Sequence, residues 1–204
     1  MLKVCMIVVC LTWGGPTLAA SFEHCSRPDA KVARAAILGA ADLAMRAAAA
    51  VGDTAGYGHW FGHFTSRNGE QVRANLKAIR NELGSDDLKA VCLGPQDVDC
   101  KEGTYAFVMF ERPGVVHLCP SFFEMPGMAD ARVGRVDIED GTREGTFIHE
   151  LSHFPFTAGT EDECYGRTTC ADLATRAPPR AIAAADSYQY FAEDVTLTFW
   201  LAAH

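Results

Sequence analysis

Three features are scarce in this chain of 204 residues, and each scarcity argues against a class of protein. Basic residues do not predominate: 18 lysines and arginines stand against 26 aspartates and glutamates. The net charge of −8 argues against a nucleic-acid partner, which requires a basic face. Apolar runs that could cross a bilayer are missing, because "VCMIVVCLTW" near the N-terminus has only ten residues. No Cys-x-x-Cys pair occurs, which weakens the case for a cysteine metal site.

The first twenty residues have the features of a secretory signal. Lys3 provides a positive start, the ten-residue apolar run follows, and "GGPTLAA" offers small residues for cleavage near Ala19 or Ala20. The alternative is a buried N-terminal helix. We expect a signal peptide over residues 1–20, a single domain over 21–204, and a secreted or periplasmic protein.

Cysteine usage agrees with export. Removal of the signal takes away Cys5 and Cys10. An even number in an exported chain indicates three disulfides, and six cysteines permit fifteen pairings among which spacing does not choose. The six that remain are Cys25, Cys92, Cys100, Cys119, Cys164 and Cys170.

Apolar periodicity predicts a mostly helical α+β domain with one small sheet. Helices are expected over 28–51, 69–83, 142–154 and 164–176, and from Pro178 or Pro179 to about Leu201. "TYAFVMF" and "GVVHLC" are short β-rich runs joined by a turn, so they predict two strands. "GDTAGYGHWFGHF" is punctuated by glycine and predicts a loop, in which His59 and His63 pack around Trp60 and Phe61 and do not ligate a metal.

The most informative stretch is "GTFIHELSHFPFTAGTEDECYG", which contains His-Glu-x-x-His. Residues four apart share one helix face, so His149 and His153 can bind one zinc ion. Glu150 lies beside the metal without ligating it, where it can transfer a proton as a general base. Neither a third histidine nor a distant glutamate of the usual kind follows. The third ligand is therefore expected among three neighbouring carboxylates, and spacing leaves all three open: Glu161, Asp162 and Glu163.

"HELSH" followed by "GTEDECYG" resembles the signature of the aspzincin metallopeptidases, the deuterolysin and peptidyl-Lys metalloendopeptidase family. That signature is His-Glu-x-x-His and then Gly-Thr-x-Asp-x-x-Tyr-Gly. The resemblance implies a zincin-like fold with one zinc ion and a helix that carries His-Glu-x-x-His. It also implies that Asp162 is the third zinc ligand and that the Tyr165 hydroxyl stabilises the oxyanion of the tetrahedral intermediate.

Three further stretches resemble the peptidyl-Lys branch: "YGHWFG", "AFVMFERPGVVHLCPSFF" and "AADSYQYFAED". The resemblance implies the disulfides Cys25–Cys92 and Cys100–Cys119, with Cys164–Cys170 as an added local bridge. It also implies that Asp186 holds a substrate lysine. Gln189 stands where that branch has a second acid, so we expect a preference for lysine after the scissile bond that is less strict. The strand at 114–119 is interpreted as the edge strand that pairs with extended substrate, in preference to a core strand.

These patterns together predict a secreted, monomeric zinc endopeptidase that acts on proteins or peptides, without a nucleic-acid partner or a membrane span. The alternatives are a secreted surface factor that captures zinc or proteins without turnover, and an inactive peptide-binding module. Glu150 and Tyr165 discriminate among these hypotheses, because binding alone needs neither residue.

Overall fold

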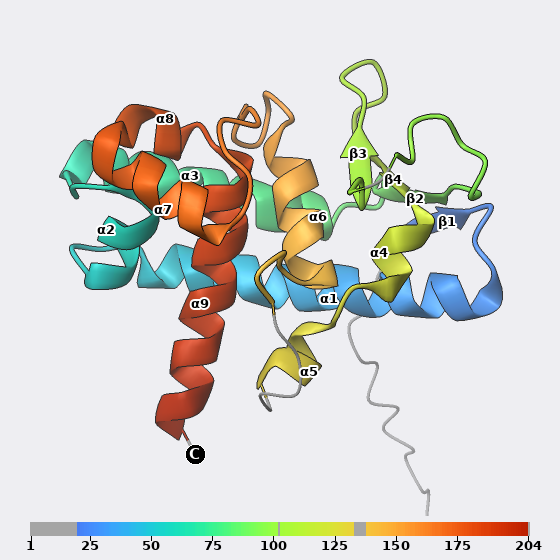
Figure 1. The fold of residues 1–204 in the computed structure, drawn as a ribbon, viewed down its shortest axis with the longest axis horizontal. Helices are drawn as coiled ribbons and strands as arrows, with labels where there is room; N and C mark the ends of the chain where they lie inside the picture. The colour runs from blue at the N-terminus through green and yellow to red at the C-terminus, as the bar shows by residue number, and fades with distance from the viewer. Residues whose placement is uncertain (1–19, 102, 133–137, 204) are drawn as a thin grey trace, which may run out of the picture.

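The computed structural model describes residues 20–101, 103–132 and 138–203, which form a set of helices with one small mixed sheet at one end of the molecule (Figure 1). The helices are α1 (Arg27–Ala50), α2 (Ala55–Phe61), α3 (Ser66–Leu83), α4 (Pro120–Glu124), α5 (Met128–Arg132), α6 (Arg143–Ser152), α7 (Arg167–Arg176), α8 (Pro178–Ile182) and α9 (Ala185–Ala203). The strands are β1 (Ser21–Glu23), β2 (Lys89–Cys92), β3 (Ala106–Val108) and β4 (Val115–Leu118). The predicted α+β class is confirmed. The predicted signal peptide lies outside the described residues, apart from Ala20.

Helix α1 runs along the long axis of the molecule, and α3, α6 and α9 all pack against it (Figure 1). Its N-terminus is capped by the Ser26 side chain, which accepts a hydrogen bond from the backbone N–H of Asp29. Small side chains let neighbouring helices approach α1 closely. The buried face of α1 contains Ala33, Ala36, Ala40, Ala44 and Ala47. Helix α1 therefore supports α6 and α9, which both pack against it.

The predicted loop over 52–64 is wrong, because α2 forms inside it. The Thr54 side chain caps this helix by accepting from the backbone N–H of Tyr57, and Gly62 ends it with φ at 76°. Tyr57, Trp60 and Phe61 are fully or almost fully buried at helical spacing. Burial of three aromatic side chains outweighs the cost of glycine inside a helix, which is about 1 kcal/mol per residue.

The sheet has the order β1-β2-β4-β3. Strand β2 pairs in parallel with both β1 and β4, whereas β3 pairs antiparallel with β4 and places Phe107 opposite His117. The hairpin predicted from "TYAFVMF" and "GVVHLC" is confirmed, while β1 and β2 were not predicted. Strand β4 is buried throughout and lies between two neighbours, so its interpretation as the edge strand is wrong. Strand β3 occupies that edge.

The single helix predicted from Pro178 onward is instead two helices, α8 and α9. Between them the chain pairs with the loop that follows α6: the backbone N–H of Glu161 donates to Ala183 (2.8 Å), and that of Ala185 donates to the Glu161 carbonyl (3.1 Å). The break therefore ties the loop after α6 to the start of α9, because the backbone groups that a continuous helix would use internally pair with that loop.

Three disulfides join Cys25 to Cys92, Cys100 to Cys119 and Cys164 to Cys170. These are the pairs that the family resemblance implies. The first links the start of α1 to β2, and the second ties the loop before β3 to the end of β4. Each closes a loop and so reduces the conformational freedom of the unfolded chain.

Within the described segments, no helix alone is long and apolar enough to cross a membrane. Helices α1 and α2 meet the length and composition criteria only as a pair bent by 110°.

Candidate metal centre and active site

Helix α6 carries the three residues of the His-Glu-x-x-His motif. It begins after Thr142, whose hydroxyl accepts from the backbone N–H of Gly145, and its regular part ends at Ser152. Glu150 is 6% exposed, while the two histidine side chains are 13% and 12% exposed. The rings of His149 and His153 lie one helical turn apart with their centroids 5.0 Å from each other. The sequence prediction that both histidines share one helix face is met by this geometry.

The loop after α6 is folded back onto the helix by Gly159 and Thr160. Gly159 has φ at 60°, a conformation that favours glycine. The Thr160 backbone N–H then donates to the Ser152 carbonyl at 3.1 Å, and the Ser152 and Thr160 hydroxyls are 2.5 Å apart. The Thr160 carbonyl accepts from His153 Nδ1 at 2.9 Å. This bond leaves the lone pair of His153 Nε2 available to a metal.

Asp162 completes a trio of ligand atoms. Its Oδ1 lies 3.2 Å from His149 Nε2 and 3.5 Å from His153 Nε2, and the three ligand atoms lie within 4.8 Å of one another. Two imidazole nitrogens and one carboxylate oxygen are an ordinary ligand set for catalytic zinc, so the residues fit the metal that the sequence predicts. Glu163 instead pairs with Arg180, and Glu161 belongs to no metal-binding group among the described residues.

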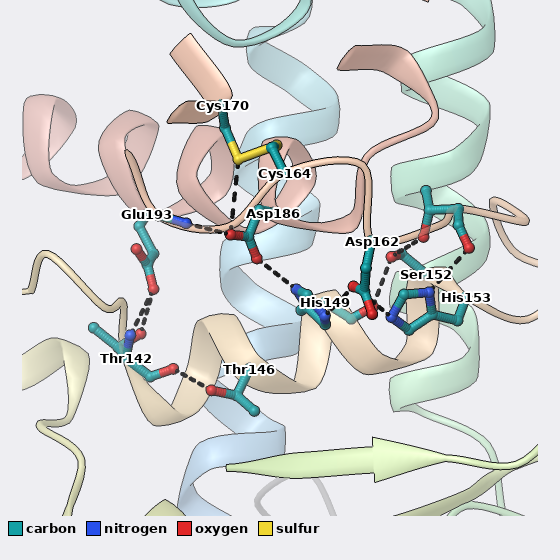
Figure 2. A network of polar contacts seen from close by, with 12 residues as sticks. Thr142, Thr146, His149, Ser152, His153, Asp162, Cys164, Cys170, Asp186 and Glu193 are labelled. Atoms are coloured by element: carbon teal, nitrogen blue, oxygen red, sulfur yellow. Dashed lines mark hydrogen bonds and ion pairs between the residues drawn. A yellow bond between two sulfur atoms is a disulfide. The ribbon is translucent and has the colours of Figure 1, made fainter. Parts of the chain in front are cut away.

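Asp186 lies directly behind the first metal ligand (Figure 2). Its Oδ1 is 2.7 Å from His149 Nδ1, and its Oδ2 accepts the backbone N–H of Gly166 at 2.9 Å. The residue is 5% exposed. The sequence analysis placed Asp186 around a substrate lysine. The structure engages both of its oxygens inside the protein, where the carboxylate orients His149 and fixes the turn at Gly166.

Tyr165 projects from this loop between Asp162 and Gly166. The residue is 66% exposed, but its hydroxyl is withdrawn toward the metal ligands. This partial burial and a hydrogen bond with Asp162 raise the pKa of Tyr165 to about 12, so the phenol remains a hydrogen-bond donor at neutral pH. The Cys164–Cys170 disulfide brackets the residue, and the Cys170 sulfur contacts Asp186 Oδ2 at 3.7 Å (Figure 2).

Two carboxylates of the site, Glu150 and the candidate ligand Asp162, have pKa values shifted in opposite directions. Burial is the main effect on Glu150 and raises its pKa. The hydrogen bond with His149 is the main effect on Asp162 and lowers its pKa to about 2. The environment therefore keeps Asp162 ionised as a ligand and brings Glu150 closer to neutral pH, where a proton-transfer group is most effective.

The metal-ligand trio opens into a cleft of about 820 Å³. One wall is β3 with its flanking residues, represented by Tyr105 and Phe110, and the opposite wall includes Asp186, Gln189 and Tyr190 at the start of α9. The edge strand therefore faces the metal site across the cleft. Gln189 lines the cleft, with its amide packed against the backbone at Gly141.

An ionic network that the sequence analysis missed ties α6 to α9. Arg167 donates to Glu193 at 2.6 Å, to Asp194 at 2.7 Å and to the Ile138 carbonyl at 3.1 Å. Glu193 Oε1 also accepts both the backbone N–H and the hydroxyl of Thr142, each at 2.8 Å (Figure 2). Burial is the main cause that raises the pKa of Glu193 to about 7. The sequence signal was the pair of acids Glu193 and Asp194 within an otherwise largely apolar stretch of α9.

A helix with His-Glu-x-x-His, a carboxylate ligand from the next loop and a cleft with an edge strand define a zinc peptidase site of the zincin class. The family described as "Lysine-specific metallo-endopeptidase" matches residues 46–193, and the chain belongs to this aspzincin family. The structure is similar to "Zinc peptidase from Grifola frondosa", with a TM-score of 0.69 and 28% identity, over 83% of this chain and 97% of that one.

Two curated relatives give the same family. The "Peptidyl-Lys metalloendopeptidase" of Pleurotus ostreatus is 36% identical over 142 residues, which are 69% of this chain and 74% of that protein. The "Extracellular protease" of Aeromonas hydrophila is 34% identical over 138 residues, which are 68% of this chain. This match spans 35% of the length of the Aeromonas protein.

Proposed function

We propose that this chain is a secreted zinc-dependent endopeptidase that holds one zinc ion and favours lysine after the scissile bond. The observation that carries the proposal is the position of Glu150. It is a buried carboxylate with a raised pKa, and it follows His149 in the trio completed by His153 and Asp162. A site that only stored metal would gain nothing from this residue.

Bound zinc supplies Lewis-acid chemistry: it lowers the pKa of a water molecule and polarises a carbonyl oxygen. The chain supplies the remaining steps. Glu150 accepts a proton from the attacking water and delivers it to the leaving amine. The Tyr165 hydroxyl donates a hydrogen bond to the substrate oxygen as negative charge develops on it. Asp186 and the Thr160 carbonyl keep both histidine rings in the orientation that directs Nε2 to the metal.

Substrate binds along β3. This strand has one neighbour, β4, and its other edge faces the cleft, so an extended peptide can add to it through backbone hydrogen bonds. Strand β3 starts at the end of the cleft where Asp140 lies, because Tyr105, which precedes the strand, is close enough to Asp140 for that carboxylate to add to the rise in its pKa that burial causes. A peptide that runs antiparallel to β3 therefore places the residues after the scissile bond at the Tyr105 end.

Preference for lysine is supported by the names of the relatives and by the acidic character of the chain, whose net charge is −8. Secretion is supported by three disulfides, by a relative named "Extracellular protease" and by the apolar run near the N-terminus. The competing function is a secreted factor that captures zinc or protein without turnover. The buried Glu150 and the protonated Tyr165 hydroxyl favour the enzyme.

The test is digestion of denatured casein by the zinc-loaded protein, with and without a chelator, followed by mapping of the new N-termini. We expect cleavage that the chelator abolishes and added zinc restores, with lysine dominant after the cut. Full zinc occupancy without cleavage would establish the binding factor instead. Cleavage before mainly apolar residues would retain the peptidase and remove the lysine preference.

A further inference from the structure

Asp140 lines the catalytic cleft at the Tyr105 end, and Gln189 packs against Gly141, the residue that follows it. We propose that Asp140 is the specificity-determining residue that supplies the negative charge for a cationic substrate side chain immediately after the scissile bond. This inference rests on the proposed function and identifies how that site recognises its substrate. The direction of substrate along β3 places this side chain at the end of the cleft that Asp140 lines.

The other carboxylates in the cleft are committed elsewhere. Asp162 is a ligand and Glu150 transfers protons. Asp186 has both oxygens engaged, one by His149 Nδ1 at 2.7 Å and the other by the Gly166 backbone N–H at 2.9 Å. A substrate ammonium at Asp186 would have to compete with the hydrogen bond that orients a metal ligand.

Glu161 is separated from this end by the length of α6. It follows Thr160, which is bonded to the C-terminal end of α6, whereas Asp140 precedes Thr142, the N-terminal cap. A ten-residue helix is about 15 Å long. Gln189 is close to Asp140 but neutral, so its amide oxygen can accept a hydrogen bond without supplying charge. Among the described residues that line this end of the cleft, Asp140 is the carboxylate with capacity for an ammonium.

The segment that carries Asp140 is anchored on both sides. The Gly141 backbone N–H donates to the Ile138 carbonyl at 2.8 Å, and the same carbonyl accepts from Arg167 Nε at 3.1 Å. The next residue, Thr142, is held by the buried Glu193. Gly141 adopts φ at 86°, and a Cβ there would lie 1.9 Å from Gln189 Nε2. The turn is thus packed against Gln189, which reduces the entropy lost when Asp140 binds a ligand.

The chemistry of this end suits an ammonium group. Asp140 lies close enough to the Tyr105 hydroxyl to contribute, after burial, to its raised pKa, and the lone pairs of its carboxylate are available to a substrate. A lysine ammonium offers three donors on a long apolar stem, which matches one fixed carboxylate with the Gln189 amide nearby. The two groups together account for recognition of lysine by a pocket in which one acid is replaced by glutamine.

The test compares two synthetic peptides that differ only after the scissile bond, one with lysine and one with norleucine, the uncharged analogue of similar length. For Asp140→Asn we expect the ratio of kcat/KM values, lysine over norleucine, to fall about tenfold, the effect of losing one hydrogen bond between charged groups. Cleavage of the norleucine peptide should hardly change. Asp140→Asn together with Gln189→Glu should recover most of the ratio, because the charge returns to the same end of the cleft.

Glu124→Gln is the matched control. Glu124 lines a neighbouring hollow of about 300 Å³ together with Asp140, but it does not line the catalytic cleft. Its substitution removes the same charge and should leave the ratio unchanged. An unchanged ratio in Asp140→Asn, or an equal fall of the ratio in Glu124→Gln, would overturn this inference. Cleavage of the peptides by the wild type would still support the proposed function in that case. A zinc-loaded wild type that cleaved neither these peptides nor casein would overturn both.

Discussion

The carboxylate of Asp186 accepts a hydrogen bond from His149 Nδ1 at 2.7 Å and is almost fully buried. This contact fixes a proton on Nδ1, so in the metal-bound enzyme the lone pair of Nε2 is free for an ion shared with Asp162, whose Oδ1 lies 3.2 Å away. The same carboxylate holds the backbone at Gly166, one residue after Tyr165. One buried side chain on α9 therefore holds both His149, the proposed metal ligand, and the turn beside Tyr165, the proposed oxyanion donor.

Asp186→Asn should lower zinc affinity by about 10- to 100-fold, because removing the charge weakens the partner of a metal-ligating histidine. Competition with a chelator of known affinity measures this change. Asp172→Asn is the control, since Asp172 forms an exposed ion pair with Arg176 on α7. If Asp186→Asn kept wild-type zinc affinity and lost only its preference for lysine, the role first inferred from the sequence would be correct.

Asp162→Ala should lose zinc at modest chelator concentration, whereas Glu161→Ala and Glu163→Ala should retain it. The reason is that Asp162 Oδ1 lies against both histidine nitrogens, while Glu163 is paired with Arg180. Zinc content is measured by elemental analysis after dialysis. Loss of metal from the Glu161 variant with retention in the Asp162 variant would show that the ligand assignment is displaced by one residue.

Tyr165→Phe should lower kcat by about 10²- to 10³-fold, the usual effect of removing one oxyanion donor, while zinc content and KM change little. The phenol is protonated throughout the neutral range, because burial raises its pKa to about 12. Steady-state kinetics on one peptide across neutral pH measures the change. A Phe variant with wild-type kcat would assign Tyr165 to packing alone.

How much of this site the sequence predicts depends on how local each relationship is. His149, Glu150 and His153 share one helix face, so their spacing and the helix predicted around them point to one site. Residues 159–166 follow a motif whose members the structure explains one by one: Gly159 makes the turn and the Thr160 carbonyl orients His153.

Relationships between distant segments were the ones missed. The role of Asp186 depends on the packing of α9 beside α6. The position of β3 at the sheet edge depends on the pairing of β4 with β2, which makes β4 an inner strand. Neither pairing leaves a periodic signal in the chain. Helix α2 was missed for a different reason: its glycines oppose a helix locally, and aromatic burial against α9 reverses that preference.

Glu193 should make stability depend on pH. Its folded pKa of about 7 lies above the ordinary value of 4.5, so its stabilising contribution is complete below pH 4.5 and is lost as pH rises through 7. Glu193→Gln lacks this titration. Relative to that variant, the wild type should lose on the order of 3 kcal/mol of unfolding free energy between pH 4.5 and 7.5. Urea unfolding at several pH values measures the difference, and a difference independent of pH would contradict the shift.

The central claim is that Glu150 acts in catalysis and does not bind the metal. The most direct measurement is kcat for a lysine peptide with Glu150→Gln, made at zinc content verified by elemental analysis. The proposed mechanism predicts one zinc ion per chain, as in the wild type, with kcat lower by several orders of magnitude, because the proton-transfer group is lost while the ligands remain. Substantial turnover by the fully zinc-loaded variant, or loss of zinc from it, would contradict the claim.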